Sequence, residues 1–123
     1  MKVFVSSKSG EVITKPLTRL AERELLSGKD GDDYIPSGYY IILDDSFFFG
    51  AAGKYAINLK DIIQKRNHTK PSRLNGCCGV DGCDGPNLLD EEGNEIGTEK
   101  SDCWMPHCAI LEPDKVNMKD LEE

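Results

Sequence analysis

The candidate chemistry of this sequence is concentrated in one segment, residues 77–108. Zinc in proteins is held by four thiolate or imidazole ligands, and ligands that share a turn are usually separated by two to four residues. Two pairs follow this spacing, with four intervening residues in the first and three in the second: Cys78 with Cys83, and Cys103 with His107. The sequence therefore predicts a zinc site made of these four side chains, with Cys77 and Cys108 as alternative ligands.

The same cysteines have two other interpretations. Cysteine is among the residues most often buried, so these thiols can also be small apolar packing groups in a metal-free segment. A thiol-dependent redox enzyme would instead use the adjacent Cys77 and Cys78, with Cys83 or Cys103 as the resolving thiol. A disulfide between the adjacent Cys77 and Cys78 would strain the intervening peptide, which disfavours the redox interpretation. We therefore favour a noncatalytic binding or interaction protein, and the sequence leaves both a zinc-bound and a metal-free segment open.

Two further turns have the spacing of zinc knuckles, in which two cysteines separated by two residues precede a glycine. Ser6 and Ser9 stand at the ligand positions before Gly10, and the second turn has Asp90 and Gly93 at the equivalent positions. On these motifs, residues 1–15 and 73–111 resemble small bacterial zinc-ribbon-like proteins, in which two such turns share one metal ion. A serine hydroxyl stays protonated at neutral pH, so the resemblance implies a degenerate ribbon that has lost its metal at these positions.

Charge is distributed unevenly along the 123 residues, whose net charge is -7. Residues 1–80 carry 12 basic and 9 acidic side chains, whereas residues 81–123 carry 3 basic and 13 acidic ones. Such an acidic surface opposes nucleic-acid binding. One basic cluster is present, without the interleaved aromatic residues that stack on single strands: Lys60, Lys65, Arg66, Lys70 and Arg73. We therefore expect no nucleic-acid partner, and we expect the acidic C-terminal region to contact a protein partner.

Apolar runs and cysteine number indicate the cellular compartment. The longest apolar runs, Tyr39–Leu43 and Phe47–Ala52, are far shorter than the roughly 18 to 20 residues of a membrane-spanning helix. The N-terminal residues turn polar after Val5 and lack the continuous apolar region of a secretory signal. Five cysteines cannot all pair with one another, which favours thiols that are reduced or metal-bound. These features predict a cytoplasmic protein with no membrane partner.

The elements that position the cysteines are predicted from apolar periodicity and turn residues. Alternating residues predict a hairpin from Lys2–Val5 and Glu11–Thr14, and buried strands at Tyr39–Leu43 and Cys108–Leu111. Apolar residues at helical intervals predict a helix from Leu17 to Gly28 and a clearer one from Asn58 to Asn67.

These elements together predict one α+β domain, with a small antiparallel sheet, one or two helices and a long loop region rich in glycine and cysteine. Within this domain, residues 1–72 form the α/β body and residues 73–111 form the ribbon-like segment. Residues 112–123 form an acidic tail that is expected to fray.

Overall fold

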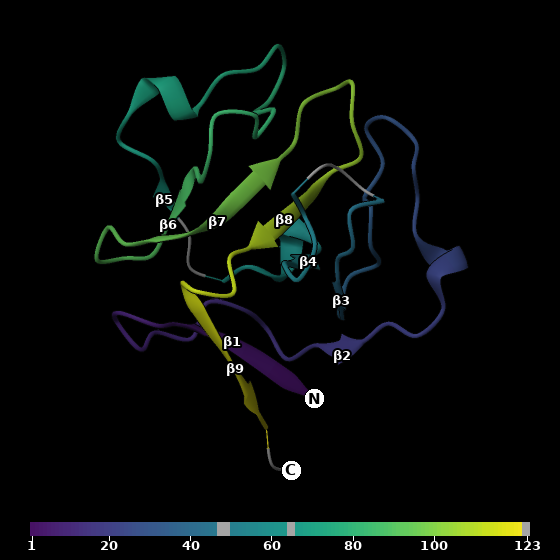
Figure 1. Ribbon diagram of the computed structural model, residues 1–123, viewed down its shortest axis with the longest axis vertical. Helices are drawn as coiled ribbons and strands as arrows, with labels where there is room; N and C mark the ends of the chain where they lie inside the picture. The colour runs from purple at the N-terminus through teal and green to yellow at the C-terminus, as the bar shows by residue number, and fades with distance from the viewer. Residues whose placement is uncertain (47–49, 64–65, 122–123) are drawn as a thin grey trace.

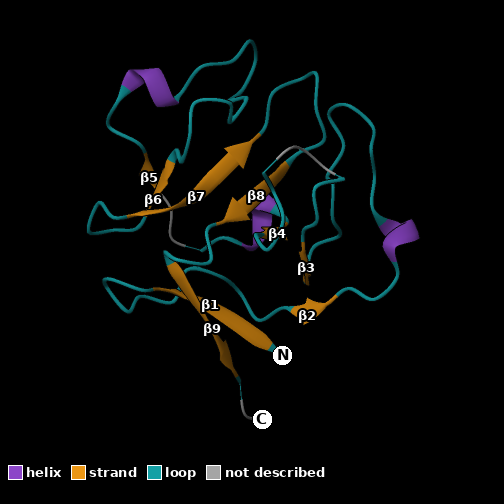
Figure 2. Cartoon of the chain, in the orientation of Figure 1, coloured by secondary structure: helices purple, strands orange, loops and turns teal. Residues whose placement is uncertain are grey.

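The fold was analysed in a computed structural model, which describes residues 1–46, 50–63 and 66–121. Strand residues make up 34% and helical residues 8% of the part of the chain that the structure describes. The helical residues within the described ranges are three single 3-10 turns: η1 (Arg23–Leu25), η2 (Leu59–Asp61) and η3 (Pro71–Arg73). The predicted α+β class is therefore wrong, because the protein is mostly β, as Figure 2 shows.

Two sheets contain the strands (Figure 1). In the two-stranded sheet, β1 (Lys2–Ser6) pairs antiparallel with β9 (Val116–Asp120). The larger sheet is mixed, because its first two strands are parallel and every other pair is antiparallel. Its strands, in spatial order, are β2 (Thr18–Arg19), β3 (Tyr39–Ile42), β4 (Tyr55–Ile57), β8 (Cys108–Leu111), β7 (Glu95–Lys100), β6 (Leu88–Leu89) and β5 (Arg66–Asn67).

Each segment predicted as a helix contains a single 3-10 turn within the described residues. Leu17 and Leu20 are buried, but they flank the short strand β2, and Leu25 is exposed in η1. Asn58 does cap a helical turn, since its side chain accepts a hydrogen bond from the Lys60 backbone N–H, but the turn ends at Asp61. Apolar residues three positions apart, such as Leu59 and Ile62, are therefore compatible with a single 3-10 turn as well as with a longer helix.

The predicted strands are largely present. The runs predicted at 39–43 and 108–111 form β3 and β8, each of which has a neighbouring strand on both sides. The N-terminal hairpin is present as a bridge between Val5 and Val12, and β1 also pairs with β9. Residues 116–120 of the tail that we expected to fray are therefore part of a sheet. Phe47–Phe49 and Lys65, which belong to the predicted apolar run and basic cluster, lie outside the described residues.

The core consists of two groups of apolar side chains. One contains Phe4 of β1 together with Ile57, Leu111 and Val116, so it joins the two sheets. The other contains Ile35, Ile110 and Cys108. Because β7 and β8 pair from Gly97–Leu111 to Lys100–Cys108, their connecting loop, residues 101–107, leaves the sheet at a fixed position. That loop carries part of the candidate site.

Candidate metal centre

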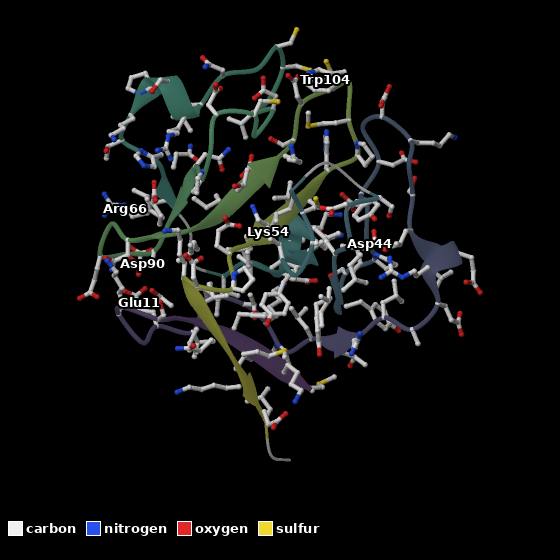
Figure 3. All side chains as sticks on the ribbon, in the orientation of Figure 1. Glu11, Asp44, Lys54, Arg66, Asp90 and Trp104 are labelled. Atoms are coloured by element: carbon white, nitrogen blue, oxygen red, sulfur yellow. The ribbon has the colours of Figure 1, made fainter. Side chains whose placement is uncertain are left out.

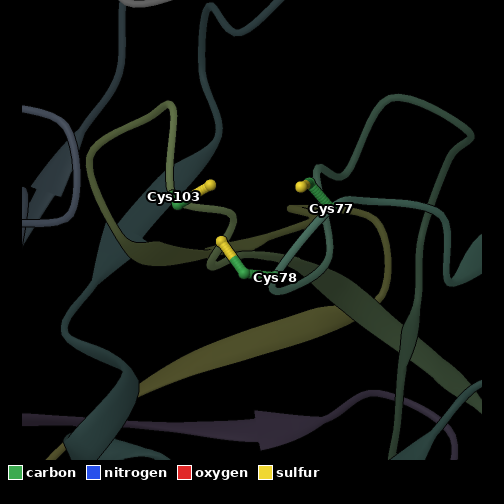
Figure 4. Close-up of side chains that lie close together, drawn as sticks. All are labelled: Cys77, Cys78 and Cys103. Atoms are coloured by element: carbon green, nitrogen blue, oxygen red, sulfur yellow. The ribbon is translucent and has the colours of Figure 1, made fainter.

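Three thiols converge at the end of the β7–β8 hairpin. The Sγ atoms of Cys77, Cys78 and Cys103 all lie within 4.8 Å of one another, and all three residues are exposed. Figure 4 shows the three side chains pointing toward a common space between two loops. A zinc–sulfur bond is about 2.3 Å long, so small side-chain rotations would bring all three sulfurs onto one ion. We refer to Cys77, Cys78 and Cys103 as the thiol triad.

The triad spans two loops that are hydrogen-bonded to each other. Residues 74–87 supply two of the thiols, and residues 101–107 supply the third. The Ser101 backbone N–H donates to the Val80 carbonyl at 2.8 Å, and the Val80 N–H donates to the Ser101 hydroxyl at 3.2 Å. The loops approach so closely at Gly79 that a Cβ atom there would lie 2.1 Å from the Ser101 carbonyl oxygen. Only glycine permits this contact, which places the two loops side by side.

Asp102 holds both loops through one carboxylate. Its Oδ2 accepts hydrogen bonds from the backbone N–H of Cys77 at 2.8 Å and from the indole Nε1 of Trp104 at 2.8 Å. Its Oδ1 accepts from the backbone N–H groups of Cys103 at 2.8 Å and Cys78 at 3.1 Å. The N–H of Cys77, followed by the other donors, holds the pKa of Asp102 well below its usual range. A buried, ionised carboxylate therefore lies beneath the triad and orders the backbone that carries it.

The thiol of Cys78 is kept protonated by its neighbours. It donates to Asp102 Oδ1 at 3.4 Å. A hydrogen bond with the Cys103 thiol raises the pKa of Cys78, and burial and the Asp102 carboxylate raise it further. An ion that binds the triad must therefore displace a proton from Cys78, because thiolates are the metal-ligating form.

The other predicted ligands lie outside the triad. Cys83 is an exposed residue, and its Sγ lies 3.8 Å from the Asp81 carbonyl oxygen. Partial desolvation of this thiol raises the pKa of Cys83. His107 Nε2 donates to the Asp102 carbonyl oxygen at 2.9 Å. Cys108 is in the core, where burial raises its pKa to about 12. Two of the four predicted ligands, Cys78 and Cys103, are thus together, and the alternate ligand Cys77 joins them.

Asp102 was not identified from the sequence. The chain has 22 acidic residues, and the local signal at Asp102 is only its position directly before a cysteine. Aspartate often accepts a hydrogen bond from a neighbouring backbone N–H, as Asp102 does from Cys103. Its bonds to Cys77 and Cys78 cross about 25 residues of sequence and depend on the tertiary structure.

Comparison with known proteins does not add a function. No family model matches the sequence, and neither a curated protein nor a solved structure matches it.

None of the helical turns within residues 1–46, 50–63 and 66–121 has the length and apolar character needed to cross a membrane.

Proposed function

We propose that this chain is a noncatalytic binding protein that holds one zinc ion on the thiol triad. The observation that carries the proposal is the convergence of three thiols from two loops, all within 4.8 Å. Thiolates bind zinc strongly, and three protein ligands leave one coordination position for a fourth donor from solution. The fourth donor is not Asp102, because both of its oxygens are already occupied by backbone and indole donors.

The contacts of the Cys78 thiol support a binding role rather than redox chemistry. Redox-active cysteines typically have a depressed pKa that maintains a reactive thiolate. The pKa of Cys78 is raised instead, and its thiol donates a hydrogen bond to the carboxylate of Asp102. A zinc ion supplies the positive charge that would favour deprotonation of this thiol.

The partner class proposed for this chain is protein. Some of the cationic residues that a nucleic acid would need are paired with acidic ones. Arg73 Nη1 lies 3.0 Å from Glu95 Oε2. Lys60 Nζ lies 3.9 Å from Asp33 Oδ2. Trp104 is 54% exposed beside the triad, at the upper edge of the molecule in Figure 3. An exposed indole on a fixed loop is typical of protein contact surfaces.

Zinc titration of the reduced protein tests the proposed function. We expect about one zinc ion per chain at saturation, and the Cys77→Ser, Cys78→Ser and Cys103→Ser variants should each bind it at least about tenfold more weakly. Cys83→Ser is the matched control, because Cys83 is also an exposed cysteine of the same loop region but lies outside the triad. Binding that is absent from the wild type, or reduced equally by Cys83→Ser, would contradict the proposal.

Thiol reactivity distinguishes the redox alternative. If the triad were a redox centre, one of its thiols would react much faster with an alkylating reagent than Cys83 does, in protein free of metal. We expect no such fast thiol, and we expect zinc to protect three thiols from modification.

A further inference from the structure

Two turns that are remote in sequence meet in the fold, beside the start of β9. The first, residues 6–10, follows β1, and the second, residues 90–94, connects β6 to β7. Figure 3 shows Glu11 and Asp90 next to each other where these turns meet. The Glu91 backbone N–H donates to Glu11 Oε2 at 3.4 Å, which confirms the approach. We refer to these two turns as the turn pair.

A hydrogen bond between two buried side chains joins the turn pair. The Ser6 hydroxyl donates to Asp90 Oδ2 at 2.6 Å across 84 residues of sequence. Ser6 is 1% exposed and Asp90 is fully buried. A hydrogen bond to a charged acceptor in such a position is stronger than one between neutral groups. This hydrogen bond therefore connects the N-terminal turn to the turn between β6 and β7 of the large sheet.

Each turn also has the backbone geometry of a tight reversal that ends in glycine. In the first turn, the Gly10 N–H donates to the Ser6 carbonyl at 2.9 Å, and Gly10 has φ = 76°. In the second, the Gly93 N–H donates to the Asp90 carbonyl at 3.1 Å, and Gly93 has φ = 85°. Each glycine adopts a left-handed conformation that other residues rarely accept. The two turns thus face each other through the first residue of each, Ser6 and Asp90.

Zinc does not fit the side chains that occupy the turn pair. Ser6 and Ser9 carry hydroxyls rather than thiols, and Gly93 has no side chain to offer. Asp90 Oδ1 is also occupied, since it accepts from the backbone N–H groups of Glu92 and Asn94, both at 2.9 Å. The side-chain oxygens of Ser6, Ser9 and Asp90 each accept a hydrogen bond from a protein donor, as is usual for polar groups in a folded protein.

We propose that the turn pair is a metal-free knuckle pair, in which the Ser6–Asp90 hydrogen bond takes the place of the ion that joins two zinc knuckles. This inference concerns residues outside the thiol triad and does not depend on zinc binding there. It predicts that the wild-type turns are coupled energetically without metal. It also predicts that thiols at the same positions create a metal site.

A double-mutant cycle tests the coupling in the native chain. In metal-free buffer, the unfolding constants of Ser6→Ala, Asp90→Asn and the double variant should reveal a coupling of about tenfold between the two side chains. A control cycle combines Asp90→Asn with Ser37→Ala, whose hydroxyl donates to Asp61 at 2.6 Å, and these two changes should be additive. Additivity of Ser6→Ala with Asp90→Asn would overturn the proposal.

Installed thiols test the metal geometry. The variant Ser6→Cys, Ser9→Cys, Asp90→Cys is made in a Cys77→Ser, Cys78→Ser, Cys103→Ser background, so that triad zinc does not contribute. We expect about one zinc per chain and a higher Tm in zinc than in chelator. The control carries Ser7→Cys, Lys8→Cys and Glu91→Cys, exposed positions on the same two turns, and it should bind at least about tenfold more weakly.

Each outcome of the thiol experiment bears on the proposal. We call the Ser6→Cys, Ser9→Cys, Asp90→Cys variant the facing set. The proposal would be overturned if the facing set and the control bound zinc equally, or if a folded facing set bound no zinc. A facing set that folds only when zinc is added supports it, because binding free energy then becomes folding free energy. If the facing set does not fold under either condition, the double-mutant cycle decides. Failure of zinc binding by the wild-type triad would leave all these results unchanged.

Discussion

Asp102 organises the thiol triad at the scale of single residues without being a ligand. Its carboxylate accepts backbone N–H groups from Cys77, Cys78 and Cys103, so the three thiols are anchored to one charged group. A carboxylate beneath a metal site orients the ligands and, by its negative charge, favours a bound cation. The arrangement also raises the thiol pKa of Cys78, so the proposed zinc binding should depend on pH.

Replacement of Asp102 by asparagine should weaken zinc binding with little change to the ligands themselves. The amide keeps one acceptor oxygen but presents an NH2 group to backbone N–H donors, so one of the loops loses its anchor. We expect the zinc affinity to fall by about 10- to 100-fold, measured by competition with a chromophoric chelator. Asp84→Asn is the control, since Asp84 lies in the same loop region and accepts from the Asn75 side chain. Equal affinities for wild type and Asp102→Asn would contradict the role of this carboxylate.

Zinc binding should strengthen as the pH rises. The pKa of Cys78 is raised in the metal-free protein, so its thiol remains protonated at neutral pH and a proton is released when zinc binds. The apparent affinity should therefore increase steadily from about pH 6 to about pH 8. In Cys78→Ser the slope of log affinity against pH should be smaller by about one proton. An affinity that is independent of pH in the wild type would argue against thiolate ligation.

The sequence predicts the chemistry of individual residues better than their grouping. Cys78 and Cys103 were expected together and are together, whereas Cys83 and His107 were chosen because their spacing from Cys78 and Cys103 is that of zinc ligands that share a turn. Spacing describes ligands that share a turn, but the triad draws its ligands from two loops. The contribution of the adjacent Cys77 depends on the Gly76–Gly79 turn, where a Cβ on Gly76 would lie 1.7 Å from the Gly79 carbonyl oxygen.

The β7–β8 hairpin is the element that fixes the site, because both the 101–107 loop and the docked 74–87 loop depend on its position. Within it, Gly97 lies opposite Leu111, and a Cβ at Gly97 would be 2.2 Å from the Ile110 carbonyl oxygen. The backbones of β7 and β8 therefore approach more closely at Gly97 than a residue with a side chain would allow.

Gly97→Ala should destabilise the large sheet. The added methyl group must displace backbone atoms of β8, and overpacking of this kind costs about 1–3 kcal/mol in the free energy of unfolding. Urea unfolding followed by circular dichroism measures the change. Gly28→Ala is the control, because a Cβ at Gly28 has no heavy atom within 4 Å and this change should have an effect below about 0.5 kcal/mol. Equal stability of Gly97→Ala and wild type would contradict the close approach.

Elements were predicted well where the apolar run was continuous and poorly where it was periodic. Cys108–Leu111 is buried along its whole length and Tyr39–Ile42 in its middle, because each strand has a neighbouring strand on both sides. The interval between Leu59 and Ile62 was assigned to a helix, but both side chains pack on the core from a 3-10 turn and the residue that ends it. The pairing of β1 with β9 joins residues more than 100 positions apart, and no local pattern predicts it.

Two buried carboxylates, Asp90 and Asp102, connect segments that are far apart in the sequence. Burial acts to raise the pKa of Asp90, but hydrogen bonds from Ser6 and Asn94 outweigh it and lower this pKa to about 2. The pKa of Asp102 is also lowered, chiefly by the Cys77 N–H. Groups with a folded pKa below the unfolded value stabilise the fold above the unfolded pKa and lose this contribution as the pH falls through the folded one.

The Tm of the protein should therefore fall most steeply between about pH 4 and about pH 2. Asp90→Asn removes one of the responsible groups, so this variant should have a lower Tm at neutral pH and a shallower decrease in acid. Differential scanning calorimetry in metal-free buffer measures both. A decrease of the same steepness in the variant and the wild type would show that Asp90 does not contribute to the acid response.

Trp104 donates its indole N–H to the same Asp102 oxygen that anchors Cys77, and it is the single tryptophan of the chain. Its fluorescence therefore arises from one known position beside the triad. When an ion replaces the Cys78 proton, the charge around Asp102 changes and the emission of this indole should shift in wavelength or intensity. The native protein thus carries its own optical reporter of metal occupancy, which Trp104→Phe should abolish without loss of zinc stoichiometry.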